Sequence, residues 1–206
     1  MYPIFLDLTN RKCIVVGAGE VAERKINALL NAGADILVIG PTATAAIRQL
    51  AESGKVARSE RDFIPGDLDG AFLVIAATDD RRTNELVYRE AGRRGTLVNV
   101  VDAPELCNFF VPAVVERGRL KVAISTGGAS PALAAKLRAR FERELGPEYA
   151  DYVEVIDDFR RRVIKRVADP AERKRAYERL FASDLLDQVK RGAKIDIETL
   201  VSKHAG

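Results

Sequence analysis

Two glycines near the start of the chain, Gly17 and Gly19, follow an apolar run over residues 12–16, and Ala22 stands three positions further on. This spacing is typical of the strand, tight turn and helix that bind a dinucleotide. The first glycine allows the turn, the second lets the backbone approach a pyrophosphate, and the small residue lets the helix lie close to the strand. A tight turn needs glycine with or without a ligand, but the complete pattern favours a dinucleotide whose phosphates meet the helix N-terminus.

Whether such a site binds NAD or NADP depends on the residue that contacts the adenosine ribose. This residue usually follows the second strand. The second predicted strand here ends in Ile39-Gly40-Pro41-Thr42, with no Asp or Glu. No arginine follows directly to receive a 2′-phosphate, since Arg48 lies within the next predicted helix. Backbone groups and the Thr42 hydroxyl could still contact the ribose. Spacing alone therefore leaves NAD and NADP open.

Polar residues also follow the fourth predicted strand. Thr78-Asp79-Asp80 comes directly after the apolar run over residues 71–77. These side chains are therefore expected at the carboxyl edge of a parallel sheet, where ligands bind. For Asp80, a helix cap and a ligand contact are equally compatible with the sequence. We include Thr78 and Asp79 among the predicted cofactor-binding residues.

Asp102 follows the fifth predicted strand and reaches the same edge. An Asp before a small residue and a proline, here Ala103-Pro104, is common in turns, so a turn role and a site role are both open. Further on, the loop over residues 126–131 combines glycines with a Ser-Pro helix start. It could bind an anion at the helix N-terminus, but we favour a capped hinge.

Strands and helices alternate along the first half of the chain. The predicted strands cover residues 12–16, 35–39, 56–59, 71–77 and 97–101, and the predicted helices cover 20–31, 43–53 and 83–93. This alternation predicts an α/β fold with a Rossmann-type, doubly wound parallel sheet. Two β-rich runs, 109–115 and 120–125, then predict an antiparallel hairpin, and the rest of the chain is predicted to be helical.

The composition of the 206 residues is ordinary for a globular protein, with 47% hydrophobic and 31% charged residues. No apolar run approaches the roughly 20 residues needed to span a membrane, and the N-terminus lacks the features of a signal peptide. Cys13 and Cys107 form no metal spacing and no disulfide framework, so we expect no metal site and a cytoplasmic protein. A net charge of +3 is too small to indicate nucleic-acid binding but would suit an anionic substrate.

Four segments resemble the precorrin-2 dehydrogenase family of siroheme synthesis, in the order and at the spacing of that family. They are Gly17–Lys25, Ala76–Asp80, Asn99–Pro104 and Ser125–Pro131. The resemblance covers nearly the whole chain and extends to the N-terminal half of siroheme synthase. It implies a homodimeric enzyme that oxidises the tetrapyrrole precorrin-2 to sirohydrochlorin and passes hydride to NAD⁺.

The resemblance also implies roles for individual residues. Asp102 matches the candidate catalytic residue of that family, and Thr126 stands where siroheme synthase has a phosphorylatable serine, so regulation by phosphorylation is not carried over. Loss of hydride must be accompanied by loss of a proton, which a carboxylate beside the nicotinamide could accept. The NAD contacts of the family match Gly17, Gly19, Glu20, Val21, Pro41 and Thr42.

These features divide the chain into an NAD-binding Rossmann domain over residues 1–112, a dimerisation segment over 113–146 and a C-terminal helical domain over 147–206. The apolar hairpin would expose strand edges, which favour pairing with another chain, so we expect a two-fold dimer through this segment.

Nine basic residues between Glu154 and Arg179 are interleaved with acids. They are compatible both with a solvated helical face and with contacts to substrate carboxylates.

Two alternatives stay open for the function. Some relatives also insert iron into sirohydrochlorin, and no sequence feature separates such a bifunctional enzyme from a dehydrogenase alone. The single histidine, His204, lies in a C-terminal tail that we expect to be disordered, which is a poor place for a metal ligand. An NAD-sensing module that binds nucleic acid is disfavoured, because acids separate the basic residues and no helix-turn-helix pattern is present. We expect neither nucleic acid nor a membrane as a partner.

Overall fold

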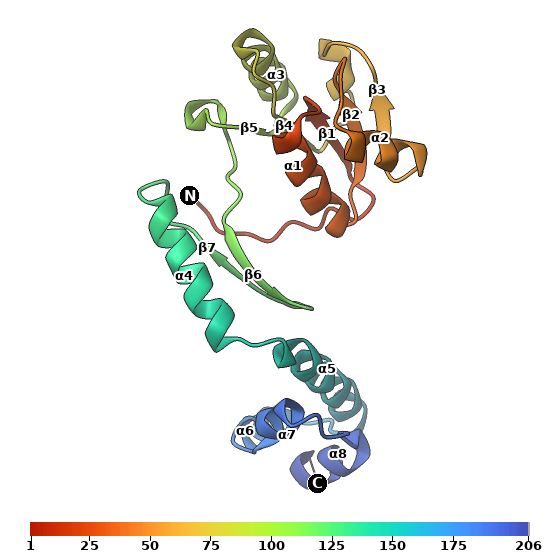
Figure 1. Ribbon diagram of the computed structural model, residues 1–206. Coiled ribbons are helices and arrows are strands. Elements are labelled where there is room, and N and C mark those ends of the chain that lie inside the picture. The colour runs from red at the N-terminus through yellow and green to blue at the C-terminus, as the bar shows by residue number, and fades with distance from the viewer. Residues whose placement is uncertain (206) are drawn as a thin grey trace. The chain divides into compact units, whose positions relative to one another are not determined.

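The computed structural model describes residues 1–205, and the chain divides into two compact units between Val111 and Pro112. The first unit contains a sheet with helices, and the second contains a hairpin and further helices (Figure 1). Each unit has hydrophobic cores of its own.

A five-stranded parallel sheet forms the centre of the first unit. The chain begins in the middle of this sheet, crosses to one edge and then returns to build the other, so the order of strands reverses between β1 and β4. The predicted doubly wound α/β fold is confirmed. The strands are β1 (Lys12–Val16), β2 (Asp35–Ile39), β3 (Ala57–Ser59), β4 (Leu73–Ala76) and β5 (Leu97–Val100), in the order β3-β2-β1-β4-β5.

Helices cover both faces of the sheet, because successive residues of each strand point to opposite faces and both faces are apolar. Val15 of β1 lies in a core with residues of α1 (Glu20–Asn31) and α2 (Ala45–Glu52). Its neighbour Ile14 lies in a second core with residues of α3 (Arg81–Arg94). Both side chains are fully buried.

Side-chain caps determine where two of these helices begin. Thr44 caps α2, so this helix begins at residue 45 and not at residue 43 as predicted. Asp80 caps α3, so this helix begins before the predicted residue 83. A cap accepts hydrogen bonds from the first N–H groups of a helix, which have no partner within it.

The second unit begins with an antiparallel hairpin of β6 (Ala113–Arg117) and β7 (Leu120–Ile124). The hairpin was expected, but its first strand begins four residues after the predicted residue 109. Pro112 has no N–H for a ladder hydrogen bond, so a strand does not extend easily through it. Helix α4 (Pro131–Glu144) packs on the hairpin and completes a small apolar core.

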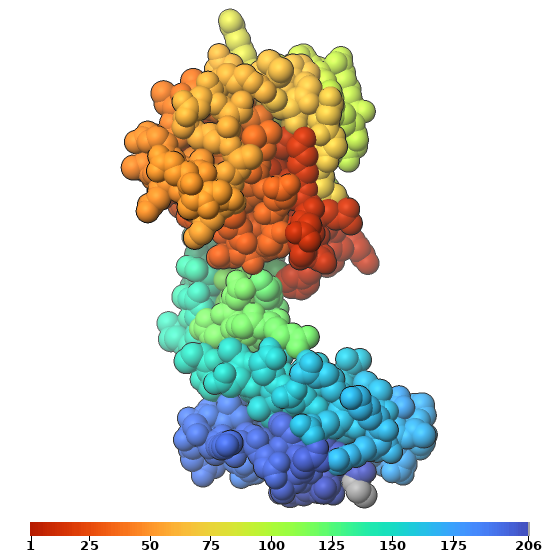
Figure 2. Space-filling model, turned by 90° about the vertical axis from the view of Figure 1, so that its right-hand side faces the viewer, coloured from red at the N-terminus to blue at the C-terminus, as the bar shows by residue number. Residues whose placement is uncertain are grey.

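Four further helices complete the second unit, drawn in cyan and blue in Figure 2. They share one apolar core, in which Phe159, Val163 and Leu180 are fully buried. The last helix contacts two of the others and closes this cluster. The four helices are α5 (Glu148–Arg166), α6 (Pro170–Phe181), α7 (Leu185–Lys190) and α8 (Ile197–Ala205).

The expectation of a disordered C-terminal tail is wrong, because this segment forms α8. His204 lies on α8 with 5% of its surface exposed, and its Nε2 atom has no hydrogen-bond partner among the described residues. The guanidinium of Arg179 on α6 donates to the backbone carbonyl of His204. Burial lowers the pKa of the His204 imidazole, and the positive charges of Lys203 and Arg179 act in the same direction.

Protonation of His204 should therefore destabilise the folded chain. The imidazole has a pKa of about 6.5 in the unfolded chain and a lower pKa in the folded chain, so the unfolded state binds more protons below about pH 6.5. We expect the thermal midpoint to fall between about pH 7 and pH 5, by about 2–4 °C for each kcal/mol lost, and to fall less in His204→Leu. Circular dichroism melts of both proteins measure this difference. The same pH dependence in the two proteins would contradict it.

Candidate functional site

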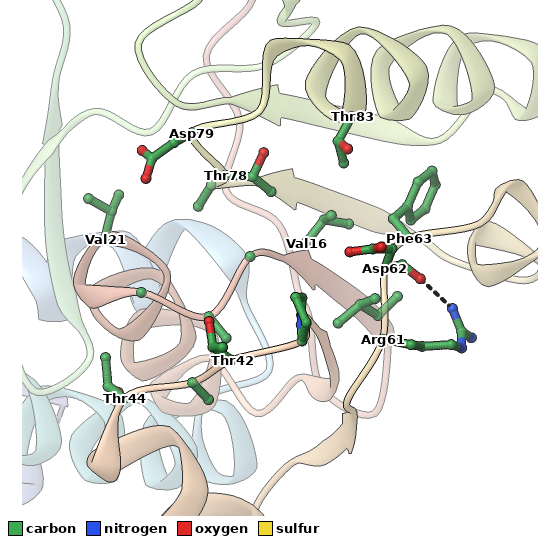
Figure 3. A pocket seen from close by; sticks show the side chains of 18 of the residues that line it. Val16, Val21, Thr42, Thr44, Arg61, Asp62, Phe63, Thr78, Asp79 and Thr83 are labelled. Carbon is green, nitrogen blue, oxygen red and sulfur yellow. Dashed lines mark hydrogen bonds between the residues drawn. The ribbon is translucent and has the colours of Figure 1, made fainter.

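The carboxyl ends of the parallel strands open into a cleft of about 660 Å³ (Figure 3). The ends of β1 and β2 and the residues that follow β4 line this cleft, together with the first turn of α1 and the loop that follows β3. The structure brings all eight predicted cofactor-binding residues together here, and their contact with a dinucleotide stays a prediction. They are Gly17, Gly19, Glu20, Val21, Pro41, Thr42, Thr78 and Asp79.

Gly17 is required by the fold. Its φ is +104°, and a Cβ at this position would lie 2.2 Å from the carbonyl oxygen of Ala77. The turn after β1 therefore passes directly against the end of β4, in a conformation that L side chains rarely adopt. The Gly17 N–H also donates to the carbonyl of Ile39 in β2, at 2.8 Å. This turn is thus fixed between both strands that neighbour β1.

Gly19 has a different role. A Cβ at this position would meet no heavy atom within 4 Å, and the φ of −85° suits any L residue. The fold does not need glycine here, so a side chain would have room on the wall of the cleft. Because Gly19 has no side chain, its backbone is accessible where the dinucleotide fingerprint places a pyrophosphate.

The N-terminus of α1 is open to the same cleft. Gly19 is the N-cap residue, and no side chain caps the helix. Among the described residues, the N–H groups of Glu20, Val21 and Ala22 have no backbone acceptor outside the helix. Such N–H groups carry the positive end of the helix dipole and can hold an anionic phosphate. The site therefore fits the pyrophosphate of a dinucleotide.

The residues after β4 divide between structural roles and the cleft. The Asp80 carboxylate accepts hydrogen bonds from the N–H groups of Arg82 and Thr83, at 3.2 and 3.1 Å, and from the Thr83 hydroxyl. These bonds lower the pKa of Asp80. Of the two roles that the sequence left open for Asp80, the structure shows the helix cap. The Thr78 hydroxyl is bonded within the same turn, and both Thr78 and Asp79 line the cleft.

Sequence reasoning missed the loop between β3 and the short helix η1 (Pro65–Leu68). Arg61, Asp62 and Phe63 of this loop line the cleft, because β3 is parallel to β2 and ends at the same edge. A position directly after a parallel strand was the available signal. However, β3 is only three residues long, and so short a strand marks its end poorly in the sequence.

Asp102 lies at the same edge of the sheet but is not among the residues that line the cleft. Its φ is +60°, a left-handed conformation that Gly, Asn and Asp tolerate best. The side chain is exposed, and no hydrogen bond or ion pair joins it to another described residue. The carboxylate therefore does not cap its own turn, in contrast to that of Asp80.

A polar network fixes the turn that carries Asp102. The Cys107 thiol accepts a hydrogen bond from the Val100 N–H at 3.2 Å and lies 3.3 Å from the carbonyl oxygens of Val100 and Ala103. The Asn108 side chain forms two further hydrogen bonds with the backbone at β5. Because β5 is an edge strand, these side chains pair with polar groups that a further strand would otherwise cover.

In the second unit, the loop over residues 126–131 forms a capped turn. Ser130 accepts a hydrogen bond from the Leu133 N–H at 3.1 Å and thereby caps α4. The Thr126 hydroxyl accepts from the Ser130 N–H and donates to the Ser130 carbonyl. These polar groups are satisfied by one another, so the predicted cap is present, and the hinge stays a prediction.

Most of the nine basic residues between Glu154 and Arg179 are engaged within the second unit. Two of them pair with Glu198 of α8, and five others pair with acids or carbonyl groups. Arg160 and Lys165 have no such partner in the described part of the chain. Exposed ion pairs contribute little stability, so a solvated face and a role in substrate binding both stay open for this stretch.

The structure contains no evident metal centre within residues 1–205, since no three Cys, His, Asp or Glu side chains gather into a group that could hold an ion. Both cysteines are free thiols, and burial raises the pKa of Cys13 to about 11. None of the described helices is both long and apolar enough to cross a membrane.

Gly17 and Gly19 should respond differently to substitution by valine. Gly19→Val should fold like the wild type, because a Cβ there meets no neighbouring atom, but it should weaken NAD⁺ binding by about tenfold or more, because the side chain blocks the phosphate site. Gly17→Val should lose much of its stability, since its Cβ would lie 2.2 Å from a backbone oxygen. Thermal melts and calorimetric titration separate the two effects. A folded Gly19→Val that binds NAD⁺ normally would contradict this assignment of the cleft.

Comparisons with known protein families divide the chain into three parts. Residues 4–113 match a family described as "Putative NAD(P)-binding", which covers the unit that contains the cleft. Residues 117–144 match "Sirohaem biosynthesis protein central", and residues 148–204 match "Sirohaem synthase dimerisation region". The dimerisation description thus falls on α5 to α8 and not on the hairpin.

Individual relatives agree with these matches. The siroheme synthase of Methylococcus capsulatus is 40% identical over 203 residues, which are 98% of this chain and 43% of that protein. That of Methylobacillus flagellatus is 42% identical over 92% of this chain and 41% of that protein, so the chain spans less than half the length of these relatives. A solved structure, "SirC, precorrin-2 dehydrogenase", covers 98% of both chains with 26% identity and a TM-score of 0.82. With these family matches and this full-length structural likeness, the chain belongs to the precorrin-2 dehydrogenase family of siroheme synthesis.

Proposed function

We propose that this chain is an NAD-dependent dehydrogenase that oxidises precorrin-2 to sirohydrochlorin. The observation that carries the proposal is the likeness to a precorrin-2 dehydrogenase over 98% of both chains, with a TM-score of 0.82. The cleft adds chemical support, because an open glycine turn and an uncapped helix N-terminus lie beside polar side chains at the sheet edge.

Residues of the first unit hold NAD⁺ in this proposal. The N–H groups at the start of α1, next to Gly19, bind the pyrophosphate. Pro41 and Thr42 contact the adenosine part, and Thr78 and Asp79 bound the cleft after β4. When bound, NAD⁺ supplies the acceptor for a hydride.

Asp102 is the proposed general base. Oxidation removes a hydride and a proton from the macrocycle, and the proton needs an acceptor of its own. Asp102 follows β5, which pairs with β4 at the edge where the cleft lies. Its carboxylate is exposed and has no task in the fold, while hydrogen bonds of Cys107 hold its turn. An exposed carboxylate can also meet a substrate too large to enter the cleft.

The test of the activity is the oxidation of precorrin-2 by the purified chain in the absence of air. We expect sirohydrochlorin and NADH to form in equal amounts, as followed by absorbance, and neither to form without NAD⁺. A folded protein that binds NAD⁺ but leaves precorrin-2 unchanged would contradict the proposed activity.

Asp102→Asn should lower kcat by about 10²–10⁴-fold, the usual contribution of a positioned base. NAD⁺ affinity and the thermal midpoint should stay unchanged, because Asn tolerates the left-handed conformation as Asp does. Asp102→Gly is the matched control for the backbone, since Gly adopts a φ of +60° without strain. It should lose activity in the same way. Near-normal turnover in both variants would contradict the assignment and make Asp79 the next candidate.

We also propose that the chain forms a homodimer. The match of residues 148–204 to a dimerisation region supports this assembly. The second unit also exposes large apolar side chains, among them Ile164 at 42% and Phe181 at 58%. The edges of the two-stranded hairpin offer another surface that could pair with a second chain.

Light scattering at micromolar concentration should give twice the chain mass of 22.6 kDa. If α5 to α8 form the interface, Phe181→Asp should shift the protein towards the monomer, because a buried charge without a partner is costly. Gln49→Glu, which adds a negative charge at an exposed residue of α2 in the first unit and away from the cleft, serves as the control for added charge. A monomeric mass for the wild type would contradict the dimer.

A further inference from the structure

We infer that Asp62 makes the cleft selective for NAD over NADP, by accepting hydrogen bonds from the adenosine ribose and by repelling a 2′-phosphate. The inference rests on the dinucleotide site proposed above and assigns its specificity to one residue. In most such folds an acid at the end of the second strand has this task. Here the residues after β2 include no acid, since Gly40-Pro41-Thr42 follows Ile39.

The strand register places Asp62 next to the position where that acid is missing. β3 runs parallel to β2 with Ser59 opposite Ile39, and the Gly40 N–H continues the ladder by donating to the Ser59 carbonyl at 3.1 Å. The segments after the two strands therefore leave the sheet as neighbours. Asp62 stands three residues beyond Ser59, as Thr42 stands three residues beyond Ile39, and both line the cleft.

The Asp62 side chain is free to bind a ligand. Figure 3 shows its carboxylate pointing into the cleft, whereas the Arg61 side chain extends away from it. Within residues 1–205, the Asp62 carboxylate has no hydrogen bond and no ion pair, and the residue is exposed. An ionised carboxylate only accepts hydrogen bonds, so its natural partners are hydroxyl groups such as those of a ribose.

Arg61 could receive a 2′-phosphate, but the fold holds it elsewhere. Its guanidinium forms two hydrogen bonds with the Asp67 carboxylate, at 2.6 and 2.9 Å, and a third with the Asp62 carbonyl. Asp67 is 8% exposed, and it also accepts from the Ile64 N–H. The guanidinium lowers the pKa of the Asp67 carboxyl, so the pair stays ionised.

The charges on the wall of the cleft therefore oppose a 2′-phosphate. The described lining includes three acids, Glu20, Asp62 and Asp79, and one base, Arg61, which Asp67 engages. A phosphate placed beside Asp62 would meet a like charge, and the described lining holds no free cation to offset it; such repulsion is a common source of specificity. The two hydroxyls of an unmodified ribose would instead gain an acceptor.

The test compares the binding of NADH and NADPH, measured by their fluorescence, in the wild type and in Asp62→Asn. We expect the wild type to bind NADH at least about tenfold more tightly than NADPH. Asp62→Asn should weaken the binding of NADH and strengthen that of NADPH, so that the ratio of the two affinities falls by about tenfold. Glu60→Gln removes a charge from the same loop at a side chain that is 69% exposed and does not line the cleft, so it should leave the ratio unchanged.

A second pair of variants tests the restraint on Arg61. Asp67→Asn weakens the hold on the guanidinium but keeps an acceptor for the Ile64 N–H, so it should bind NADPH more tightly than the wild type does. Adding Arg61→Ala to this variant should remove that gain. If Asp67→Asn does not fold, Asp62→Asn and Glu60→Gln still decide the assignment.

The outcomes separate this inference from the proposed function. A ratio that changes less than about twofold in Asp62→Asn, or a wild type that prefers NADPH, overturns the role of Asp62 and leaves the dinucleotide site in place. A folded wild type that binds neither nucleotide overturns the dinucleotide site, and the role of Asp62 with it.

Discussion

The contact between the turn after β1 and the end of β4 is the constraint on which the first unit depends. Because a Cβ on Gly17 would lie 2.2 Å from the carbonyl oxygen of Ala77, these two segments can approach only with glycine at this position. Their approach joins parts of the chain that lie sixty residues apart. It places the open N-terminus of α1 and the polar residues after β4 on one cleft, at the point where the strand order reverses.

Four of the acids around this edge of the sheet fall into two groups. Asp80 and Asp67 serve the fold: the first caps α3 and the second holds Arg61, and their hydrogen bonds lower the pKa of both carboxyls. Asp62 and Asp102 neither cap nor pair with described residues, and both are exposed. The folded chain gains no contact from an acid at these two positions. A functional role therefore explains the two carboxylates better than a structural one does.

The central strands and helix of the first unit could be predicted closely from the sequence, whereas the elements at the periphery could not. The bounds of β1, α1 and β2 match the prediction, because apolar runs there end at glycines. The residues that follow β3 escaped notice, because a strand of three residues carries little periodicity. A helical domain over residues 147–206 was predicted, but its tail at His204 was expected to be disordered, since the apolar face of α8 becomes evident only when it packs against α5 and α6. The left-handed φ of Asp102 is equally a property of the folded turn, not of its residue types.

Asp102 illustrates how this fold places a reactive group. Glycine would adopt the φ of +60° without steric cost. The Asp102 carboxylate forms no hydrogen bond within the described chain that would offset this cost. The turn is nevertheless well fixed, because the Cys107 thiol and the Asn108 amide bind the backbone at β5. Local strain that the surroundings stabilise in this way is characteristic of functional sites. The edge strand therefore does more than end the sheet, because the side chains that cover it also fix the backbone turn from which a free carboxylate extends, at the edge where the cleft opens.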